Sequence, residues 1–343
     1  MTNSHQFTSS AWAPFRIAPW FSPRVWGCRD LRPWYDNVVA EGDEPIGEAW
    51  LTGDHCVVSS GDHSGRALGA LFAENPEALL GPEAPHSGNP DGGASPLLIK
   101  VIFAQEKLSV QVHPDDKMAQ KYGEPRGKTE CWYVLEAKPG AQVACGLKPG
   151  VTLDQVRARI EAGTLESSLN ALDVARGEMI FVDAGTVHAI WPGTILLETQ
   201  QNCDLTYRMY DYGRGRELHL EKSLEAARFV TRAGKVPPRM LTGRSILMDG
   251  EYFRVEHIPV AGGRSSASLA HPALPGENNP ARGLAYLFAA GGAARVAGPG
   301  FEAVELHKGG IVAVPAASPE FVVEDLGELE LMRITPRWPG TNR

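Results

Sequence analysis

The stretch Lys107-Leu-Ser-Val-Gln-Val-His-Pro-Asp-Asp116 indicates the fold of the first part of the chain most directly. Apolar residues alternate along it with three polar ones, Ser109, Gln111 and His113, and this period of two is typical of a β-strand with one buried face. Pro114 then ends the strand, because proline has no N–H to donate to a neighbouring strand. A Gln-x-His pair on one strand face can supply half of a metal site. The alternative is an ordinary surface or hydrogen-bonded histidine near a strand end.

The composition is that of a soluble globular protein with many turns. The 343 residues are 43% hydrophobic and 22% charged, and the length predicts two domains. The net charge of −8 argues against nucleic acid or an anionic membrane as a partner. It still allows an anionic small substrate, because such a ligand needs only a local cluster of Arg and Lys.

The cysteines and the N-terminus bear on where the protein works. Five cysteines are odd in number and form no CxxC pattern, which favours a reduced, intracellular compartment over a disulfide framework. The first twelve residues lack the basic start and apolar run of a signal peptide, and no apolar stretch is long enough to cross a bilayer. We therefore expect a cytoplasmic protein without a membrane partner, and its oligomeric state stays open.

The first domain is predicted to span residues 15–230. Leu97–Ala104 is apolar and strand-like, and together with the opening stretch it predicts a β-hairpin. Two helical insertions are expected. One lies at about 62–96, where helical spacing is interrupted by a proline, and the other at about 152–172, where Thr-x-x-Gln has the pattern of a capping box.

A second domain is predicted after a linker at 231–245, which contains two consecutive prolines. Short strands recur over residues 246–343 between Gly, Pro and Ser turns, which predicts a smaller antiparallel β-sandwich. Its histidines have no neighbouring carboxylate pattern comparable to that of the first domain. We therefore expect this domain to be structural.

Two motifs of the first domain resemble those of cupin barrels. Gly177-x5-Asp183-Ala-Gly185-x2-His188 resembles the second cupin motif, where a glycine-rich turn carries a histidine into the barrel mouth, although Asp183 stands where proline is usual. The pair Gln111-x-His113 and Glu130 resemble an expanded first motif. The resemblance implies a mainly β fold, with a cupin-type jelly-roll barrel that carries small helical insertions and a second, degenerate cupin-like sandwich.

Four collinear segments resemble type I phosphomannose isomerases in their short bacterial form. These segments are Leu108–Asp116, Gly127–Tyr133, Ala184–Ile190 and Gln200–Tyr212. The likeness extends from about Pro19 to His219 and, more loosely, over the C-terminal domain. It implies four metal ligands, Gln111, His113, Glu130 and His188. Two imidazoles, a carboxylate and an amide oxygen suit a divalent metal of borderline hardness, with one Zn²⁺ per chain the leading choice and Mn²⁺ or Co²⁺ also compatible.

The same resemblance implies which residues meet the substrate. Arg208 is implied as an active-site cation, with Lys128 and Glu198 beside the substrate and Ser109 as a phosphate contact. Moving a proton between two sugar carbons requires a base close to the carbon acid and positive charge where the enediolate develops. Either Glu198 or Lys128 fits the part of the base, and the sequence leaves this choice open. A lysine base needs a lowered pKa, which a nearby dication and Arg208 would favour.

The sequence departs from the family pattern at two places. Cys203 stands where a small hydroxyl residue is usual, and the segment after Tyr212 is shorter than in many relatives. Arg214 and Arg216 in that segment are candidates for phosphate binding. Their alternative is a pair of solvated loop arginines.

The predicted function is a metal-dependent aldose-ketose isomerase that interconverts mannose 6-phosphate and fructose 6-phosphate through an enediol intermediate. Its partner is then a small sugar phosphate. A redox cupin that binds Fe(II) explains the histidines and the carboxylate, but it has no need of Lys128, Glu198 and Arg208. Two further alternatives are a non-catalytic sugar-phosphate-binding cupin and an isomerase of another sugar, phosphorylated or not.

Overall fold

The computed structural model describes residues 12–36, 38–40, 42–81, 84, 94–260, 264–265 and 283–338. The described chain is mostly β, and its strands pair antiparallel, as the predicted fold class requires. It divides into two compact units. Unit 1 comprises residues 1–20, 51–96 and 239–343, and unit 2 comprises residues 21–50 and 97–238.

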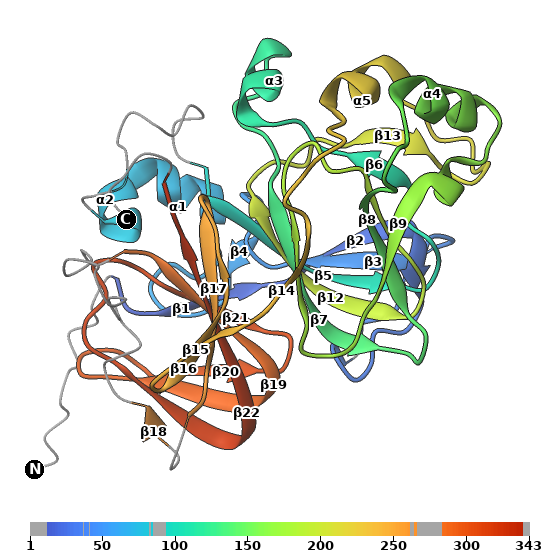
Figure 1. Ribbon diagram of the computed structural model, residues 1–343. Coiled ribbons are helices and arrows are strands. Elements are labelled where there is room, and N and C mark those ends of the chain that lie inside the picture. Colours follow the sequence, from blue (N-terminus) through green and yellow to red (C-terminus); the bar gives the residue numbers. More distant parts are fainter. Residues whose placement is uncertain are drawn as a thin grey trace, which may run out of the picture. The chain divides into compact units, whose positions relative to one another are not determined.

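Unit 2 contains two antiparallel sheets (Figure 1). The first has the order β14-β10-β7-β12-β5-β3-β2. Its strands are β2 (Trp20–Cys28), β3 (Ile46–Trp50), β5 (Leu97–Ala104), β7 (Glu130–Ala137), β10 (Met179–Val182), β12 (Thr194–Gln201) and β14 (Gly234–Val236). The second sheet has the order β13-β6-β11-β8-β9. Its strands are β6 (Val110–Val112), β8 (Gln142–Leu147), β9 (Leu169–Asp173), β11 (His188–Ile190) and β13 (Tyr207–Tyr210).

The two faces of the second sheet are buried in different ways. Apolar side chains from both sheets, among them Trp132 of β7 and Val143 of β8, form one core cluster between the sheets. On the other face, Val110 and Val112 of β6 pack with residues of α4 (Leu153–Glu161) and α5 (Leu220–Ala226). These two helices lie beside β6 and β13 in Figure 1. The predicted alternation is therefore confirmed over β6, and its polar face turns away from the helices.

The predicted hairpin between Leu97–Ala104 and the opening stretch is wrong. β5 pairs with β12 and β3, whereas β6 pairs with β11 and β13 in the other sheet. The short link through Gln105 and Glu106 carries the chain from one sheet to the other. All eight residues of β5 are buried, so this strand needs a neighbour on both edges and a covered surface on both faces.

Unit 1 is built around a ten-stranded antiparallel sheet in the part of the chain that is described. Its main path is β15-β16-β17-β22-β19-β21-β1-β4, and β18 and β20 pair beside it. The strands are β1 (Phe15–Ala18), β4 (Val57–Val58), β15 (Arg239–Leu241), β16 (Arg244–Asp249), β17 (Phe253–Ile258), β18 (Arg264–Ser265), β19 (Ala285–Ala297), β20 (Val304–His307), β21 (Ile311–Val314) and β22 (Val322–Pro336). One apolar cluster along β19, β21 and β22 forms its core.

The division of the chain differs from the continuous domains predicted at 15–230 and 246–343. β1 pairs with β21, so the start of the predicted first domain joins the C-terminal sheet. The helices α1 (Leu68–Glu74) and α2 (Pro76–Leu80) fall in the predicted insertion at 62–96, but they also belong to unit 1. The rest of that insertion, at 82–83 and 85–93, lies outside the described residues. The boundary near Pro238 falls within the predicted linker.

The other predicted insertion, at 152–172, is only partly helical. α4 begins with the predicted capping box, in which Gln155 N–H donates to Thr152 Oγ1 and the Gln155 side chain accepts from Thr152 N–H. A 3-10 turn at Leu165–Ser168 follows, and the rest of the predicted helical insertion belongs to β9. The remaining short helix is α3 (Asp116–Lys121).

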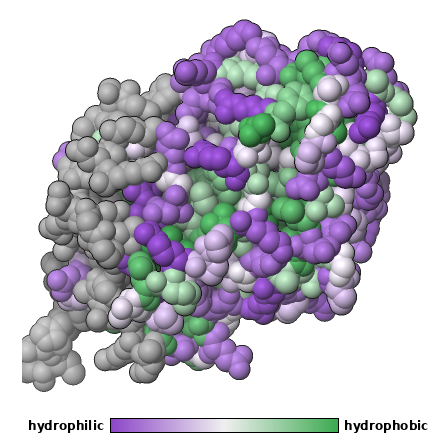
Figure 2. All heavy atoms as spheres, viewed as in Figure 1, coloured by the Kyte–Doolittle hydropathy of each residue, from purple (hydrophilic) through white to green (hydrophobic). Residues whose placement is uncertain are grey.

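None of the described helices is long and apolar enough to span a bilayer. In Figure 2, hydrophilic residues line the rim of the molecule around α4 and α5.

Candidate active site

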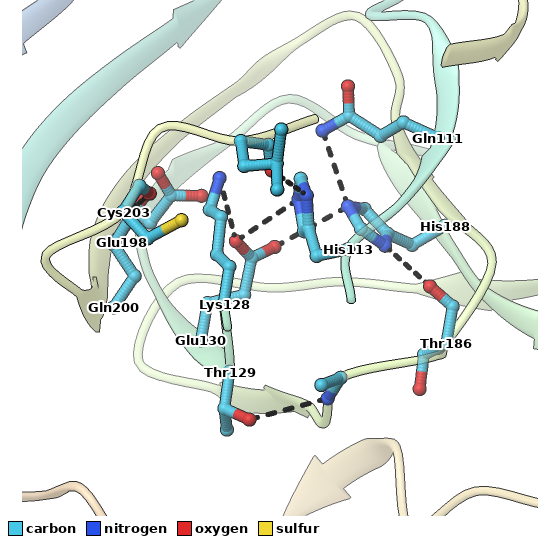
Figure 3. A network of polar contacts seen from close by, with 12 residues as sticks. Gln111, His113, Lys128, Thr129, Glu130, Thr186, His188, Glu198, Gln200 and Cys203 are labelled. Carbon is cyan, nitrogen blue, oxygen red and sulfur yellow. Dashed lines mark hydrogen bonds and ion pairs between the residues drawn. The ribbon is translucent and has the colours of Figure 1, made fainter. Parts of the chain in front are cut away.

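Three side chains with metal-ligand chemistry meet between the sheets of unit 2. His113, Glu130 and His188 place one ligand atom each within 4.8 Å of one another. Glu130 Oε2 lies 3.6 Å from His113 Nε2, and Glu130 Oε1 lies 3.5 Å from His188 Nε2. All three side chains are 1% exposed. Figure 3 shows them pointing toward one another, with Lys128 and Gln111 at the edge of the group.

Strand pairing brings these residues together from distant parts of the sequence. His188 is the Cα partner of Gln111 across β11 and β6, so both side chains point to the same face. Glu130 begins β7 opposite Val182, at the end of β10. The turn before His188 needs Gly185, whose φ of +89° is strained for other residues. Asp183 closes this turn, because it accepts a hydrogen bond of 2.8 Å from the Thr186 hydroxyl.

Both histidines present the same nitrogen to the centre. His113 Nδ1 lies 2.9 Å from the Leu205 carbonyl, and His188 Nδ1 lies 2.8 Å from the Thr186 carbonyl. A carbonyl oxygen accepts a hydrogen bond from a protonated Nδ1, so the free lone pair of each ring is on Nε2. Burial, together with the charge of Lys128, lowers the pKa of His113 well below its usual range, and burial lowers the pKa of His188 to about 4. The site therefore holds both rings neutral, as metal ligation requires.

Unsatisfied atoms at the centre provide a test of whether a metal fits. His113 Nε2 and Glu130 Oε1 are buried and have no hydrogen-bond partner among the described residues. Buried polar atoms are otherwise almost always paired. Two imidazole nitrogens and a carboxylate oxygen that share one buried point suit a divalent ion such as Zn²⁺. The residues present therefore fit the predicted metal.

Gln111 stands at the edge of the cluster. Its amide nitrogen lies 3.3 Å from His188 Nε2, and its amide oxygen accepts a hydrogen bond of 3.1 Å from the Ser109 hydroxyl. A half-turn of the amide would bring the oxygen to the metal side. Ser109, the predicted phosphate contact, thus lies beside Gln111 in the same cavity wall.

A cavity of about 440 Å³ opens beside this cluster, lined by residues of unit 2. Its lining includes every predicted substrate residue, namely Ser109, Lys128, Glu198 and Arg208. It also includes Arg216, a candidate for phosphate binding, together with Glu48 and three charged residues for which the sequence predicted no role in the site, namely Arg24, Lys100 and Asp204. The cavity therefore has many cationic side chains inside a protein whose net charge is −8.

Lys128 and Glu198 belong to one buried charge network. Lys128 Nζ lies 3.1 Å from Glu130 Oε2. Glu198 accepts a hydrogen bond of 3.2 Å from Trp132 Nε1 and lies 3.4 Å from Lys100 Nζ. Burial acts to lower the pKa of Lys128, but the nearby carboxylates outweigh it, so the chain's own groups raise this pKa. That direction is opposite to the lowering expected for a lysine base.

Lys100 is the main site residue that sequence reasoning missed. It is 1% exposed, it lies 3.3 Å from Asp204 Oδ1, and its ammonium sits 4.6 Å from the ring centre of Trp50. A signal was available, because Lys100 interrupts the otherwise apolar strand Leu97–Ala104. Lysine is almost never fully buried unless it is paired.

Arg208 and the loop after it form another wall of the cavity. Arg208 is the Cα partner of Gln111 across β13 and β6, and its Nη1 donates a hydrogen bond of 2.8 Å to the Glu217 carbonyl. Of the two loop arginines considered for phosphate binding, Arg216 lines the cavity. Arg214 is absent from the lining and instead donates to the Lys107 carbonyl.

One family description and several curated proteins match this chain. The family description "Phosphomannose isomerase type I, catalytic domain" matches residues 15–145. A probable mannose-6-phosphate isomerase of Bacillus subtilis is 36% identical over 62% of this chain and 67% of its own length. The mannose-6-phosphate isomerase of Streptococcus mutans is 34% identical over 70% of this chain and 76% of its own length.

Solved structures extend the likeness over almost the whole chain. The crystal structure of the mannose 6-phosphate isomerase from Bacillus subtilis superposes with a TM-score of 0.79 at 27% identity, covering 94% of this chain and 99% of that one. The mainly β, cupin-type fold and the family predicted from four sequence motifs are both confirmed. The chain therefore belongs to the type I phosphomannose isomerase family.

Proposed function

We propose that the chain interconverts mannose 6-phosphate and fructose 6-phosphate in the cavity of unit 2, with a bound divalent metal. One observation carries this proposal. The buried donor atoms of His113, Glu130 and His188 converge beside a cavity whose wall also holds Lys128 and Glu198. Relatives named mannose-6-phosphate isomerases support the choice of substrate.

We assign the metal to His113, Glu130 and His188, with Gln111 as the fourth ligand and Zn²⁺ as the ion. When bound, a divalent ion supplies positive charge that polarises a sugar oxygen. Its four protein ligands are two imidazole nitrogens, one carboxylate and one neutral amide. Because only one of these ligands is charged, the ion stays electrophilic. Mn²⁺ and Co²⁺ are compatible with the same donors.

Glu198 is our choice for the proton-transfer group. An aldose becomes a ketose when the proton on C2 leaves to a base, an enediol forms, and a proton returns to C1. Glu198 lines the cavity as a carboxylate oriented by Trp132 and Lys100. Lys128, by contrast, is held by Glu130 as an ammonium, so we assign it to the sugar oxygens, where negative charge develops.

Arg208 and Ser109 bind the substrate in this account. Arg208 offers a planar guanidinium to the cavity wall, which suits anionic oxygens. The Ser109 hydroxyl lies close enough to Gln111 to orient its amide and also lines the cavity. We therefore expect Ser109 to affect both metal affinity and substrate binding.

The test is turnover by the purified, metallated chain. Conversion of mannose 6-phosphate into fructose 6-phosphate is followed, with glucose 6-phosphate and unphosphorylated mannose in parallel. We expect turnover with mannose 6-phosphate and a loss of at least about a hundredfold in kcat for Glu198→Gln. Binding of mannose 6-phosphate without any turnover would favour the non-catalytic cupin, and turnover of another sugar alone would favour a different isomerase.

A further inference from the structure

The cations of the cavity differ in whether a carboxylate neutralises them. The two buried lysines have carboxylate oxygens at 3.4 and 3.1 Å, and Arg24 has Glu48 at 2.8 Å. Arg208 forms no ion pair with the described residues. Its Nη1 donates a hydrogen bond to a backbone carbonyl, and its buried Nε has no hydrogen-bond partner among the described residues. Arg208 is therefore a cation of the cavity wall that forms no ion pair with a carboxylate of the described residues.

Arg216 lies close to Arg208 and adds a second positive charge. Both residues line the cavity. Burial lowers the pKa of Arg208, and the charge of Arg216 lowers it further, while Asp211 and Glu217 act in the opposite direction. Asp211 compensates the charge of Arg216, so the two arginines and this carboxylate together keep one net positive charge at the cavity wall.

Asp211 fixes the orientation of Arg216. Its Oδ2 accepts from Arg216 Nε at 2.8 Å, and its Oδ1 accepts from Arg216 Nη2 at 2.6 Å. The Asp211 side chain is 3% exposed, and it also lies 3.5 Å from Arg214 Nη1. A guanidinium has five N–H donors, so this side-on pair leaves three of them for another acceptor. A buried carboxylate thus holds Arg216 in one orientation and leaves its other edge available.

We propose that Arg208 and Arg216 together bind the phosphoryl group of the substrate, and that Asp211 is the positioning residue for Arg216. This inference rests on the proposed function, since it names the part of that same site which recognises the phosphorylated end of the sugar. A phosphate dianion offers several acceptor oxygens, and two arginines can each supply planar, charge-assisted hydrogen bonds to it. Arg214 has no part in this contact, because it does not line the cavity.

The experiment compares Arg216→Ala with Arg214→Ala, a matched loss of one arginine from the same loop. We expect Arg216→Ala to raise KM for mannose 6-phosphate about tenfold to a hundredfold with kcat within about threefold. The inhibition constant of inorganic phosphate should rise by a similar factor. Arg214→Ala should leave both constants within about twofold. Arg216→Lys, which keeps the charge without the fork, should lie between wild type and Arg216→Ala.

Asp211→Asn tests the positioning role. It should raise KM and the phosphate inhibition constant less than Arg216→Ala does, and it should add little when Arg216 is already alanine. A merely structural role predicts instead that the two substitutions add, and that kcat and the zinc content fall together with substrate affinity. Melting temperature and metal content are measured for every variant, so a misfolded protein is recognised.

The outcomes separate this inference from the proposed function. If the wild type turns over mannose 6-phosphate but Arg216→Ala leaves KM and phosphate inhibition unchanged, the inference is wrong and the function stands. If the folded, metallated wild type shows no turnover, the proposed function fails. Calorimetric titration with inorganic phosphate then still decides the inference, because weaker binding by Arg216→Ala than by Arg214→Ala supports it and equal binding overturns it.

Discussion

Lys100 shows how much a single buried charge contributes to this site. Its ammonium is enclosed by Glu198, Asp204 and the ring of Trp50, and it is 1% exposed. Removing one partner of a buried ion pair leaves the other charge uncompensated, which costs more than the pair itself contributes. Lys100 therefore determines the stability of the cavity wall as well as its charge.

We predict that Lys100→Met lowers the free energy of unfolding by about 3 kcal/mol. The double variant Lys100→Met with Glu198→Gln should recover part of this loss, because it removes both charges. Urea denaturation of the metal-free protein measures both values. A loss below about 1 kcal/mol in the single variant, or no recovery in the double variant, would contradict the assigned ion pair.

The buried thiol of Cys145 gives a pH-dependent prediction. Burial raises the pKa of Cys145 from 9.0 to about 12. Above pH 9 the unfolded chain loses this proton and the folded chain keeps it, so the unfolded state binds fewer protons and stability falls as pH rises. Between pH 9 and 11 this thiol alone should cost about 2–3 kcal/mol. The unfolding free energy of Cys145→Ala should fall less steeply over that range, and equal slopes in the two proteins would disprove the assignment.

Sequence motifs pointed to residues that the structure brings together, but they missed part of the cavity wall. The four implied ligands come together in the structure, and their role as ligands stays a prediction. Motifs found them because each lies at a fixed offset from a strand end or a glycine turn. Asp204 carries no such offset, and only the pairing of β6 with β13 brings its segment to the cavity.

At the scale of elements, the chain before β7 is placed by a close backbone contact at Gly127. A Cβ at this position would lie 2.5 Å from the carbonyl carbon of Asp115 and 2.6 Å from the oxygen of Pro114. The next residue, Lys128, donates from its backbone N–H to the same oxygen at 3.0 Å. The contact therefore fixes the segment that carries both Lys128 and Glu130 relative to the end of β6.

We predict that Gly127→Ala lowers the unfolding free energy by about 2 kcal/mol and weakens zinc binding at least tenfold, because the backbone must shift. Calorimetric zinc titration and urea denaturation measure the two effects. Gly291→Ala is the control, since a Cβ there meets only ordinary contacts, the nearest at 3.5 Å. Equal zinc affinity in Gly127→Ala and Gly291→Ala would show that the contact does not position the ligands.

Local patterns predicted single elements well and their partners poorly. The capping box of α4 and the alternation of β6 depend on neighbours within a few residues, and the structure has both. The supposed hairpin failed because β5 and β6 are adjacent in sequence but lie in different sheets. The segment after α4 continues as β9 because it pairs with β8, a contact that no local pattern contains.

At the scale of the whole molecule, the two units differ in what their buried charges do. In unit 1, Glu256 is 0% exposed and Arg333 is 2% exposed. Arg333 Nε donates to Glu256 Oε2 at 2.8 Å, and Arg244 Nη1 lies 3.5 Å from Glu256 Oε1. No metal cluster occurs in unit 1 over the residues that could be described. We propose that this network stabilises the fold of unit 1 and takes no part in the chemistry of the site.

We predict that Glu256→Gln lowers the unfolding free energy by about 3 kcal/mol, because it leaves Arg333 buried beside a neutral amide. The metal content and kcat/KM for mannose 6-phosphate should stay within about twofold of wild type. Denaturation, metal analysis and steady-state kinetics on the same preparation test both parts. A loss of turnover in a folded, fully metallated variant would assign a functional role to unit 1.

The sequence could not predict how the chain divides between the units. β1 joins β21 across almost 300 residues, and a local pattern holds no trace of such a partner. The four motifs, by contrast, all lie within unit 2 and were enough to name the family.

Turnover in D₂O before and after metal removal decides whether the chain is a metal-dependent isomerase. The protein is stripped with a chelator, reloaded with Zn²⁺, and given mannose 6-phosphate while fructose 6-phosphate and deuterium at its C1 are followed. We expect no turnover from stripped protein, restored turnover with one Zn²⁺ per chain, deuterium at C1, and no restoration in His113→Ala. Undiminished turnover after verified metal removal would contradict the account.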